Sequence, residues 1–266
     1  MQEANVTAVM QSTHGAVVTP VNELVDAVFV VSVRTFTDRI EHMRGQMARF
    51  GIRFEWVFDF DAGSIDPALL ERTFAPSDLG PGHQSLVLKH MATWRACVER
   101  NLRRVLVFED DVVLASRFAQ VFARTLQEAD RLAPGYLVYL GCGDNRYVEG
   151  ASQAATVLVP GGPLSAADAI VFDQMAAQRR LDWVASHRIT RPADWLLREV
   201  DQECGTPHFW LSEPVVEQGS MNGRFASSLD DKRRRRGRLY AWLRYRWSKW
   251  RHRNLGGRVI RAERPH

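Results

Sequence analysis

The sequence predicts a single α/β domain in which helices flank a mainly parallel sheet. Short apolar runs rich in β-branched residues, such as residues 27–33 (AVFVVSV) and 104–108 (RVLVF), are typical of buried strands. Segments with helical periodicity separate these runs, and 266 residues suffice to bury a sizeable core. Because repeated strand–helix units build parallel sheets, any ligand site is expected at the carboxyl ends of the strands.

The elements are expected in regular alternation along the chain. The first strand, at residues 27–33, precedes a helix that Gly51 ends and whose apolar residues recur at helical spacing: Phe36, Ile40, Met43, Met47 and Phe50. A second strand is expected at residues 53–58, and a helix at 85–100 leads into the strand at 104–108. Another amphipathic helix then carries Phe118, Val121, Phe122, Leu126 and Leu132, and it precedes a strand at 136–140.

Charge divides the chain into a folded body and a basic tail. Residues 232–266 hold 14 Lys and Arg but one acid, a net +13, whereas the other 231 residues hold 21 basic and 30 acidic residues, a net −9. We therefore expect a weakly ordered segment at 1–26, a catalytic domain at 27–231 and a tail at 232–266 that meets an anionic partner. Three widely spaced cysteines, with no signal peptide or apolar run of membrane-spanning length, predict a cytoplasmic protein.

Three adjacent carboxylates, Glu109, Asp110 and Asp111, interrupt the apolar run VLVFEDDVVL. Like charges beside a buried strand are costly unless a cation joins them. Carboxylate oxygens, together with substrate phosphates, are the usual ligands of Mg²⁺ and Mn²⁺. The sequence thus predicts a metal–diphosphate site, and the alternative is an exposed acidic turn that caps the next helix.

Four blocks in order resemble glycosyltransferase family 25, the lipooligosaccharide and lipopolysaccharide biosynthesis transferases. VFEDDVVL, preceded by SLVLKHMATWRAC, resembles the family's acidic motif and the helix before it, with Lys89 in place of a common Ser. VVSVRTFTDR resembles the opening strand, FDFDAG the Ala-x-Asp-Gly block, and SEPVVEQGSMNGRFASSL the closing block. The similarity covers residues 27–229.

The resemblance implies a GT-A type fold with a Rossmann-like sheet, a UDP-sugar donor, commonly UDP-galactose, and an inverting transfer to a lipooligosaccharide or other cell-surface glycan, assisted by Mn²⁺ or Mg²⁺. It assigns Glu109 and Asp111 to the metal. The positions that it assigns to the donor are Ser32, Arg34, Arg39, Asp61, Lys89, His90, Asp110, Gln218 and Ser220.

Asp194, in RPADW, matches an acidic position of the family and is the candidate base for the acceptor hydroxyl. The other interpretation is a helix cap, and one Asp can serve both purposes. His90 has the apolar neighbours of an ordinary core histidine, so only the resemblance makes it a donor-site candidate.

The tail combines basic residues with tryptophans. In residues 232–253, Leu239, Trp242, Leu243, Trp247 and Trp250 share one helical face, which predicts a basic amphipathic helix at an anionic membrane surface, on the inner face of the cytoplasmic membrane. We expect this segment to anchor the protein without taking part in sugar chemistry. A solvated basic tail, a nucleic-acid-binding segment and an inactive sugar-binding relative are the alternatives; the acidic body argues against nucleic acid.

Overall fold

A seven-stranded sheet forms the centre of the computed structural model, which describes residues 18–143, 145–148, 150, 154–163, 166–225, 238–254 and 259–260. The strands lie in the order β2 (Glu55–Val57), β1 (Ala27–Val31), β3 (Arg104–Glu109), β8 (Ala169–Asp173), β5 (Leu137–Tyr139), β9 (His208–Leu211) and β7 (Leu158–Pro160). β2, β1 and β3 are parallel neighbours, as are β5 and β9, whereas β8 and β7 run antiparallel. The predicted fold class, a mainly parallel sheet flanked by helices, is confirmed.

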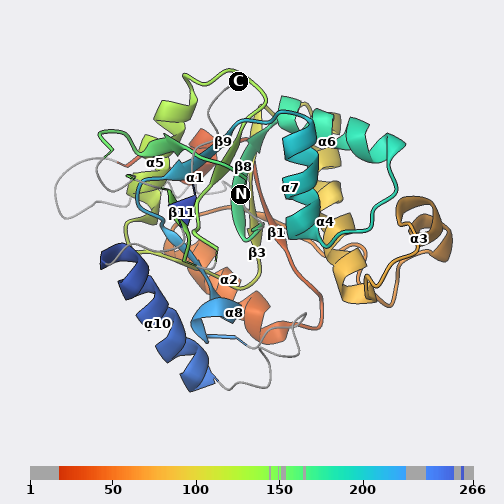
Figure 1. Ribbon diagram of the computed structural model, residues 1–266, viewed down its shortest axis with the longest axis horizontal. Coiled ribbons are helices and arrows are strands. Elements are labelled where there is room, and N and C mark those ends of the chain that lie inside the picture. Colours follow the sequence, from red (N-terminus) through yellow and green to blue (C-terminus); the bar gives the residue numbers. More distant parts are fainter. Residues whose placement is uncertain are drawn as a thin grey trace, which may run out of the picture.

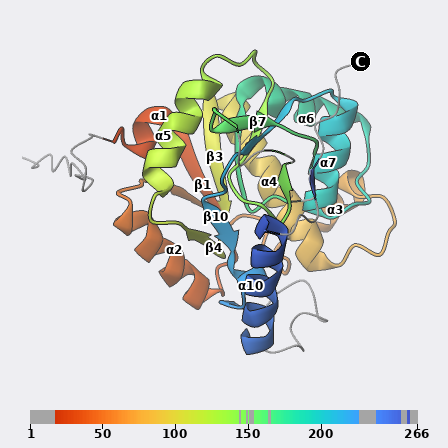
Figure 2. The ribbon, with the colours of Figure 1, turned by 60° about the vertical axis from the view of Figure 1, so that its left-hand side comes forward.

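Helices cover both faces of this sheet (Figures 1 and 2). They are α1 (Val21–Leu24), α2 (Thr37–Arg49), α3 (Pro67–Thr73), α4 (Pro81–Glu99), α5 (Phe118–Ala129), α6 (Gln174–Ser186), α7 (Ala193–Glu203), α8 (Gly219–Asn222) and α10 (Arg238–Asn254). In Figure 2, α2 and α5 lie on one side of the sheet, and α4, α6 and α7 on the other. No helix in the described part of the chain has the length and hydropathy to traverse a bilayer.

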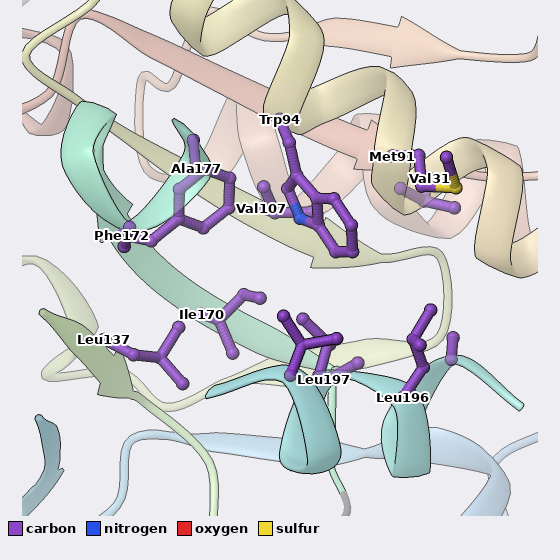
Figure 3. Packing of buried hydrophobic residues seen from close by; sticks show 14 of the residues in the cluster. Val31, Met91, Trp94, Val107, Leu137, Ile170, Phe172, Ala177, Leu196 and Leu197 are labelled. Atoms are coloured by element: carbon purple, nitrogen blue, oxygen red, sulfur yellow. The ribbon is translucent and has the colours of Figure 1, made fainter. Parts of the chain in front are cut away.

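The central strands are buried on both faces, which explains their continuous apolar sequences. Along β1, Phe29 and Val31 join the cluster beneath α4, α6 and α7, whereas Val28 and Val30 join the cluster beneath α2 and α5. Figure 3 shows the first cluster, where Trp94 of α4 lies among side chains of the strands and of α7.

Two small sheets attach the later parts of the chain to this body. β4 (Val112–Leu114) pairs antiparallel with β10 (Val216–Gln218), and β6 (Tyr147–Val148) pairs parallel with β11 (Val259–Ile260). The β4–β10 pair brings the closing block of the sequence beside the three adjacent carboxylates. Since β11 follows α10, the chain contacts the domain again beyond that helix.

The expected N-terminal segment, residues 1–26, lies mostly outside the described residues. Its described part includes α1, and Val21 and Val25 are buried in the core. Within the described residues, the packed structure therefore begins before the first strand of the sheet.

Candidate functional site

Three neighbouring carboxylates lie where β3 ends. β3 ends at Glu109 and β4 begins at Val112, so Asp110 and Asp111 form the turn between two strands. Both aspartates are buried, at 5% and 2% exposure, and Glu109 is half-buried. The alternative of an exposed acidic turn does not describe this structure.

Asp110 joins two residues from the first strand and helix. Its Oδ2 accepts a hydrogen bond of 2.7 Å from the Ser32 hydroxyl, and its Oδ1 accepts one of 2.7 Å from Arg39 Nη1. Burial raises the pKa of Asp110 although Arg39 and Ser32 oppose that shift, while the net effect on Arg39 is a raised pKa. Because the Asp110 carboxylate lies 2.7 Å from the Arg39 guanidinium, we take Asp110 as ionised and the two side chains as an ion pair.

Asp111 is held by the start of α8. Ser220 N donates to Asp111 Oδ2 at 2.9 Å, and Gly219 N donates to the Asp111 carbonyl at 2.7 Å. The other carboxylate oxygen, Asp111 Oδ1, is buried and has no hydrogen-bond partner among the described residues. A charged oxygen in this state is unfavourable unless a cation or a donor reaches it.

Glu109 lies beside polar side chains from two other elements, β10 and α4. Gln218 Nε2 donates to Glu109 Oε2 at 3.3 Å, and His90 Nε2 lies 3.8 Å from Glu109 Oε1. Burial, then the charges of Asp111 and Asp110, raise the pKa of Glu109 to about 8. Burial lowers the pKa of His90 to about 4, so His90 is neutral at neutral pH and its contact with Glu109 is not an ion pair.

Asp168, which the sequence reasoning missed, joins the same cluster from β8. It is 4% exposed, its carbonyl accepts from Glu109 N at 2.9 Å, and its Oδ2 has no hydrogen-bond partner in the part of the chain that the structure describes. Burial, followed by the charges of Glu109 and Asp111, raises the pKa of Asp168 to about 7. A sequence signal existed, because Asp168 is a lone acid before the apolar strand AIVFD.

Asp61 and Lys89 pair with each other beside these carboxylates. Lys89 Nζ donates to Asp61 Oδ1 at 2.8 Å and to the Asp59 carbonyl at 2.7 Å, and Arg34 N donates to Asp61 Oδ2 at 3.1 Å. Burial lowers the pKa of Lys89 against the opposing effect of Asp61. The Lys89 ammonium is thus directed at the loop after β2 rather than at the three adjacent carboxylates.

Asp194 is the second residue of α7, and Pro192 occupies the N-cap position. Asp194 is therefore an acidic residue of the first helical turn and not the N-cap of the helix. Asp194 Oδ1 accepts only from the next amide, Trp195 N, at 3.0 Å. Its charge adds to the raised pKa of Glu109 and partly opposes the lowered pKa of His90, which indicates that Asp194 lies near the end of β3.

A cavity of about 210 Å³ opens at the carboxyl ends of β1 and β3. The polar side chains in its lining are those of Ser32, Arg39, Ser85, Lys89, Glu109 and Asp110. The structure therefore brings five of the predicted residues from separate sequence blocks to this cavity. Hydrogen bonds connect Asp61, Gln218 and Ser220 to members of the same group.

The residues present fit a divalent cation. Within the described ranges, Asp111 Oδ1 and Asp168 Oδ2 are both buried carboxylate oxygens that lack a hydrogen-bond partner. Among the described residues, no three His, Cys, Asp or Glu side chains are arranged as a complete metal site. Carboxylate oxygens are the ligands that Mg²⁺ and Mn²⁺ prefer, and Mg²⁺ usually keeps further coordination positions for water and substrate phosphates.

Comparison with known proteins is consistent with this geometry. A sequence model described as “Glycosyltransferase family 25 (LPS biosynthesis protein)” matches residues 25–158, half of the chain. “Inactive glycosyltransferase 25 family member 3” of Homo sapiens and “Probable inactive glycosyltransferase 25 family member 3” of Bos taurus are each 32% identical over 131 residues. Each match covers 44% of this chain and 22% of the relative, so the chain corresponds to less than a quarter of their length.

Proposed function

The chain belongs to glycosyltransferase family 25, and we propose that it is an active member. It transfers a hexose, galactose in the first instance, from a UDP-sugar to a lipooligosaccharide or another cell-surface glycan, with inversion at the anomeric carbon. A divalent cation, Mn²⁺ or Mg²⁺, assists the reaction.

The observation that carries this proposal is the different environment of Asp110 and Asp111. Asp110 is neutralised by Arg39 and belongs to the wall of the cavity, whereas Asp111 keeps one buried oxygen without a partner. A purely structural turn would satisfy both carboxylates. The arrangement supports a donor in the cavity whose diphosphate lies toward Asp111.

Glu109 and Asp111 would hold the cation. When bound, it would stabilise the negative charge that develops on the leaving diphosphate. Gln218 and the Ser220 amide orient these two carboxylates through their hydrogen bonds. The closing block of the sequence thereby acts on the site through the residues that it positions.

Asp194 is the proposed base. Inversion requires a group that accepts the proton of the acceptor hydroxyl on the face opposite the leaving group. Asp194 is half-buried in the first turn of α7, and within the described residues its carboxylate accepts a hydrogen bond at Oδ1 from the Trp195 amide, which leaves Oδ2 for an acceptor hydroxyl.

An inactive, sugar-binding protein is the competing function, and the names of the two relatives favour it. A screen of UDP-galactose, UDP-glucose and UDP-N-acetylglucosamine with Mn²⁺ separates the two. Release of UDP above the buffer rate with at least one donor supports an active enzyme. Thermal stabilisation by a UDP-sugar without UDP release, with and without a lipooligosaccharide acceptor, would support the inactive protein instead.

A further inference from the structure

The helix α10 contacts the domain through one narrow face. Tyr245 is buried at 5% exposure and its carbonyl accepts from Asn145 Nδ2 at 3.5 Å. One turn further on, Lys249 donates to Glu217 of β10, and His252 Nδ1 lies 2.7 Å from the Asn145 carbonyl. Because these residues are spaced four and three apart, they form one side of the helix.

The most apolar side chains of α10 lie on the opposite side. Leu239 is 71% exposed, Leu243 54%, Trp247 62% and Trp250 49%, and their spacing of four, four and three residues places them along one stripe. A helix that docks on its own domain normally buries such a stripe. Scattered exposed hydrophobic residues are ordinary, but a continuous stripe indicates an interaction surface.

Exposed large hydrophobic side chains are concentrated on α10 within the described part of the chain. Of the eight large hydrophobic side chains exposed in the described residues, six belong to this helix. They are Leu239, Tyr240, Trp242, Leu243, Trp247 and Trp250. We call this set, together with the basic side chains beside it, the outer face of α10.

Positive charge accompanies the apolar stripe. The α10 sequence, RLYAWLRYRWSKWRHRN, contains no acidic residue, and Arg244 and Arg251 are exposed beside the stripe. The Arg246 guanidinium lies 5.1 Å from the centre of the Trp242 ring, a cation–π distance. Indoles at head-group depth and arginines at lipid phosphates are the usual composition of interfacial helices.

We propose that the outer face of α10 binds the surface of a bilayer rich in anionic phospholipids, with the helix axis parallel to that surface. Residues outside 232–266 carry a net charge of −9, so the rest of the chain is repelled on balance by anionic lipid and the basic segment that contains α10 is attracted to it. A second copy of the chain would bring two such basic helices together, and a nucleic acid offers no apolar partner for Leu239 and Leu243. This proposal does not depend on the chain being an active transferase.

The same helix borders the proposed catalytic site. α10 packs against α8, whose Ser220 amide holds Asp111 (Figure 1). Removal of residues 232–266 would therefore take away the helix that packs against α8 together with any membrane contact, so truncation would not separate the two effects. The variants used in the test must therefore keep the side of α10 that contacts the domain, which carries Tyr245, Lys249 and His252.

Binding of the full chain to vesicles tests the proposal directly. We expect flotation with vesicles of phosphatidylglycerol and phosphatidylcholine in equal amounts, little flotation with phosphatidylcholine alone, and weaker binding as salt increases. Arg244→Gln with Arg251→Gln should weaken binding on the order of 30-fold, from the usual contribution of a basic residue at an anionic surface. Leu243→Ser with Trp247→Ser should weaken it by at least about tenfold.

Two matched controls alter exposed residues elsewhere. Arg44→Gln with Arg72→Gln removes the same charge from α2 and α3, and Met175→Ser removes a side chain that is 44% exposed from α6. Both should bind vesicles within about twofold of the unchanged protein. Circular dichroism and the thermal unfolding midpoint should be the same for all variants, because every substituted side chain is exposed.

Three results would overturn the proposal. The first is a failure of either vesicle comparison: equal binding of the unchanged protein to the two kinds of vesicle, or equal losses of vesicle affinity in the control variants and the α10 variants. The second is a dimer that Leu243→Ser with Trp247→Ser converts to monomer while vesicle binding stays unchanged, which would assign the outer face to a second copy. The third is an oligonucleotide that binds more tightly than anionic vesicles, which would assign it to nucleic acid.

Discussion

Replacement of Asp110 by alanine isolates the contribution of the best-connected carboxylate of the site. Asp110 is 5% exposed and accepts from both Ser32 and Arg39 at 2.7 Å. Asp110→Ala removes the carboxylate that faces the Arg39 guanidinium, whose side chain is 12% exposed. Breaking a buried charge pair from one side typically costs about 3–5 kcal/mol, because the remaining charge stays largely desolvated.

The expected loss in the free energy of unfolding is about 3 kcal/mol. We take the lower end of that range because Arg39 retains some exposure and because burial already opposes ionisation of Asp110. A surface pair supplies the control: Arg100 donates two hydrogen bonds of 2.8 Å to Glu55, with side chains 45% and 52% exposed. Glu55→Ala should cost less than about 1 kcal/mol.

Urea unfolding followed by circular dichroism measures both free energies on the same scale. The assay needs no donor, metal or acceptor, so it is independent of whether the chain is an active enzyme. If Asp110→Ala destabilised the protein no more than Glu55→Ala, the Ser32–Asp110–Arg39 connection would not be the structural element described above.

The remaining predictions concern proton binding, backbone packing and catalysis. Because the pKa of Glu109 is raised to about 8 and that of Asp168 to about 7, the folded protein binds these protons more tightly than the unfolded chain. In chelator, the free energy of unfolding from urea titrations should thus fall as pH rises from about 6.5 to 8, above the range in which the lowered pKa values of His42 and His90 act in the opposite direction, and a flat or rising profile there would contradict the burial of both groups. Gly219→Ala would place a methyl group 2.5 Å from the Asp111 carbonyl oxygen, so α8 must shift and UDP release should drop on the order of 100-fold; wild-type turnover would contradict this. Asp194→Asn should reduce transfer by about 10²-fold or more while the calorimetric affinity for the donor stays within twofold, and unchanged transfer would remove Asp194 as the base.

Sequence periodicity was sufficient for the first half of the sheet. Residues 27–33, 53–58, 104–108 and 136–140 were expected as strands, and β1, β2, β3 and β5 lie within those segments or extend them by one residue. Their continuous apolar character follows from burial on both faces, which is a local signal. The insertion of antiparallel β8 between β3 and β5 has no local signal, since strand order depends on pairing between distant segments.

The site was predictable to the extent that it follows the ends of strands. Ser32 follows β1, Asp61 follows β2 and Asp110 follows β3, so parallel pairing brings them together. The pairing of Lys89 with Asp61 was not predicted, because it joins a helix to a loop 28 residues away through side-chain geometry. Asp168 was missed because its approach to Glu109 depends on the antiparallel strand.

The tail shows what helical periodicity leaves undecided. The sequence predicted the apolar stripe of α10 and its basic surroundings, but periodicity does not say which side of a helix meets its own domain. The structure places Tyr245 toward the domain and Trp247 toward solvent. A helix that packs on its own domain usually turns its apolar stripe inward, whereas α10 turns this stripe outward. The partners expected from the sequence, a UDP-sugar, a glycan acceptor and an anionic membrane, remain predictions, as does the cytoplasmic location.

UDP release from UDP-galactose with Mn²⁺, repeated in excess chelator and with Asp111→Asn, tests the central claim most directly. Asp182→Asn is the control, since it makes the same chemical change at an exposed position of α6. The account predicts turnover with Mn²⁺ for the unchanged protein and for Asp182→Asn, no turnover in chelator, and a loss on the order of 100-fold or more for Asp111→Asn. Full turnover in chelator, or in Asp111→Asn with Mn²⁺, would contradict the account.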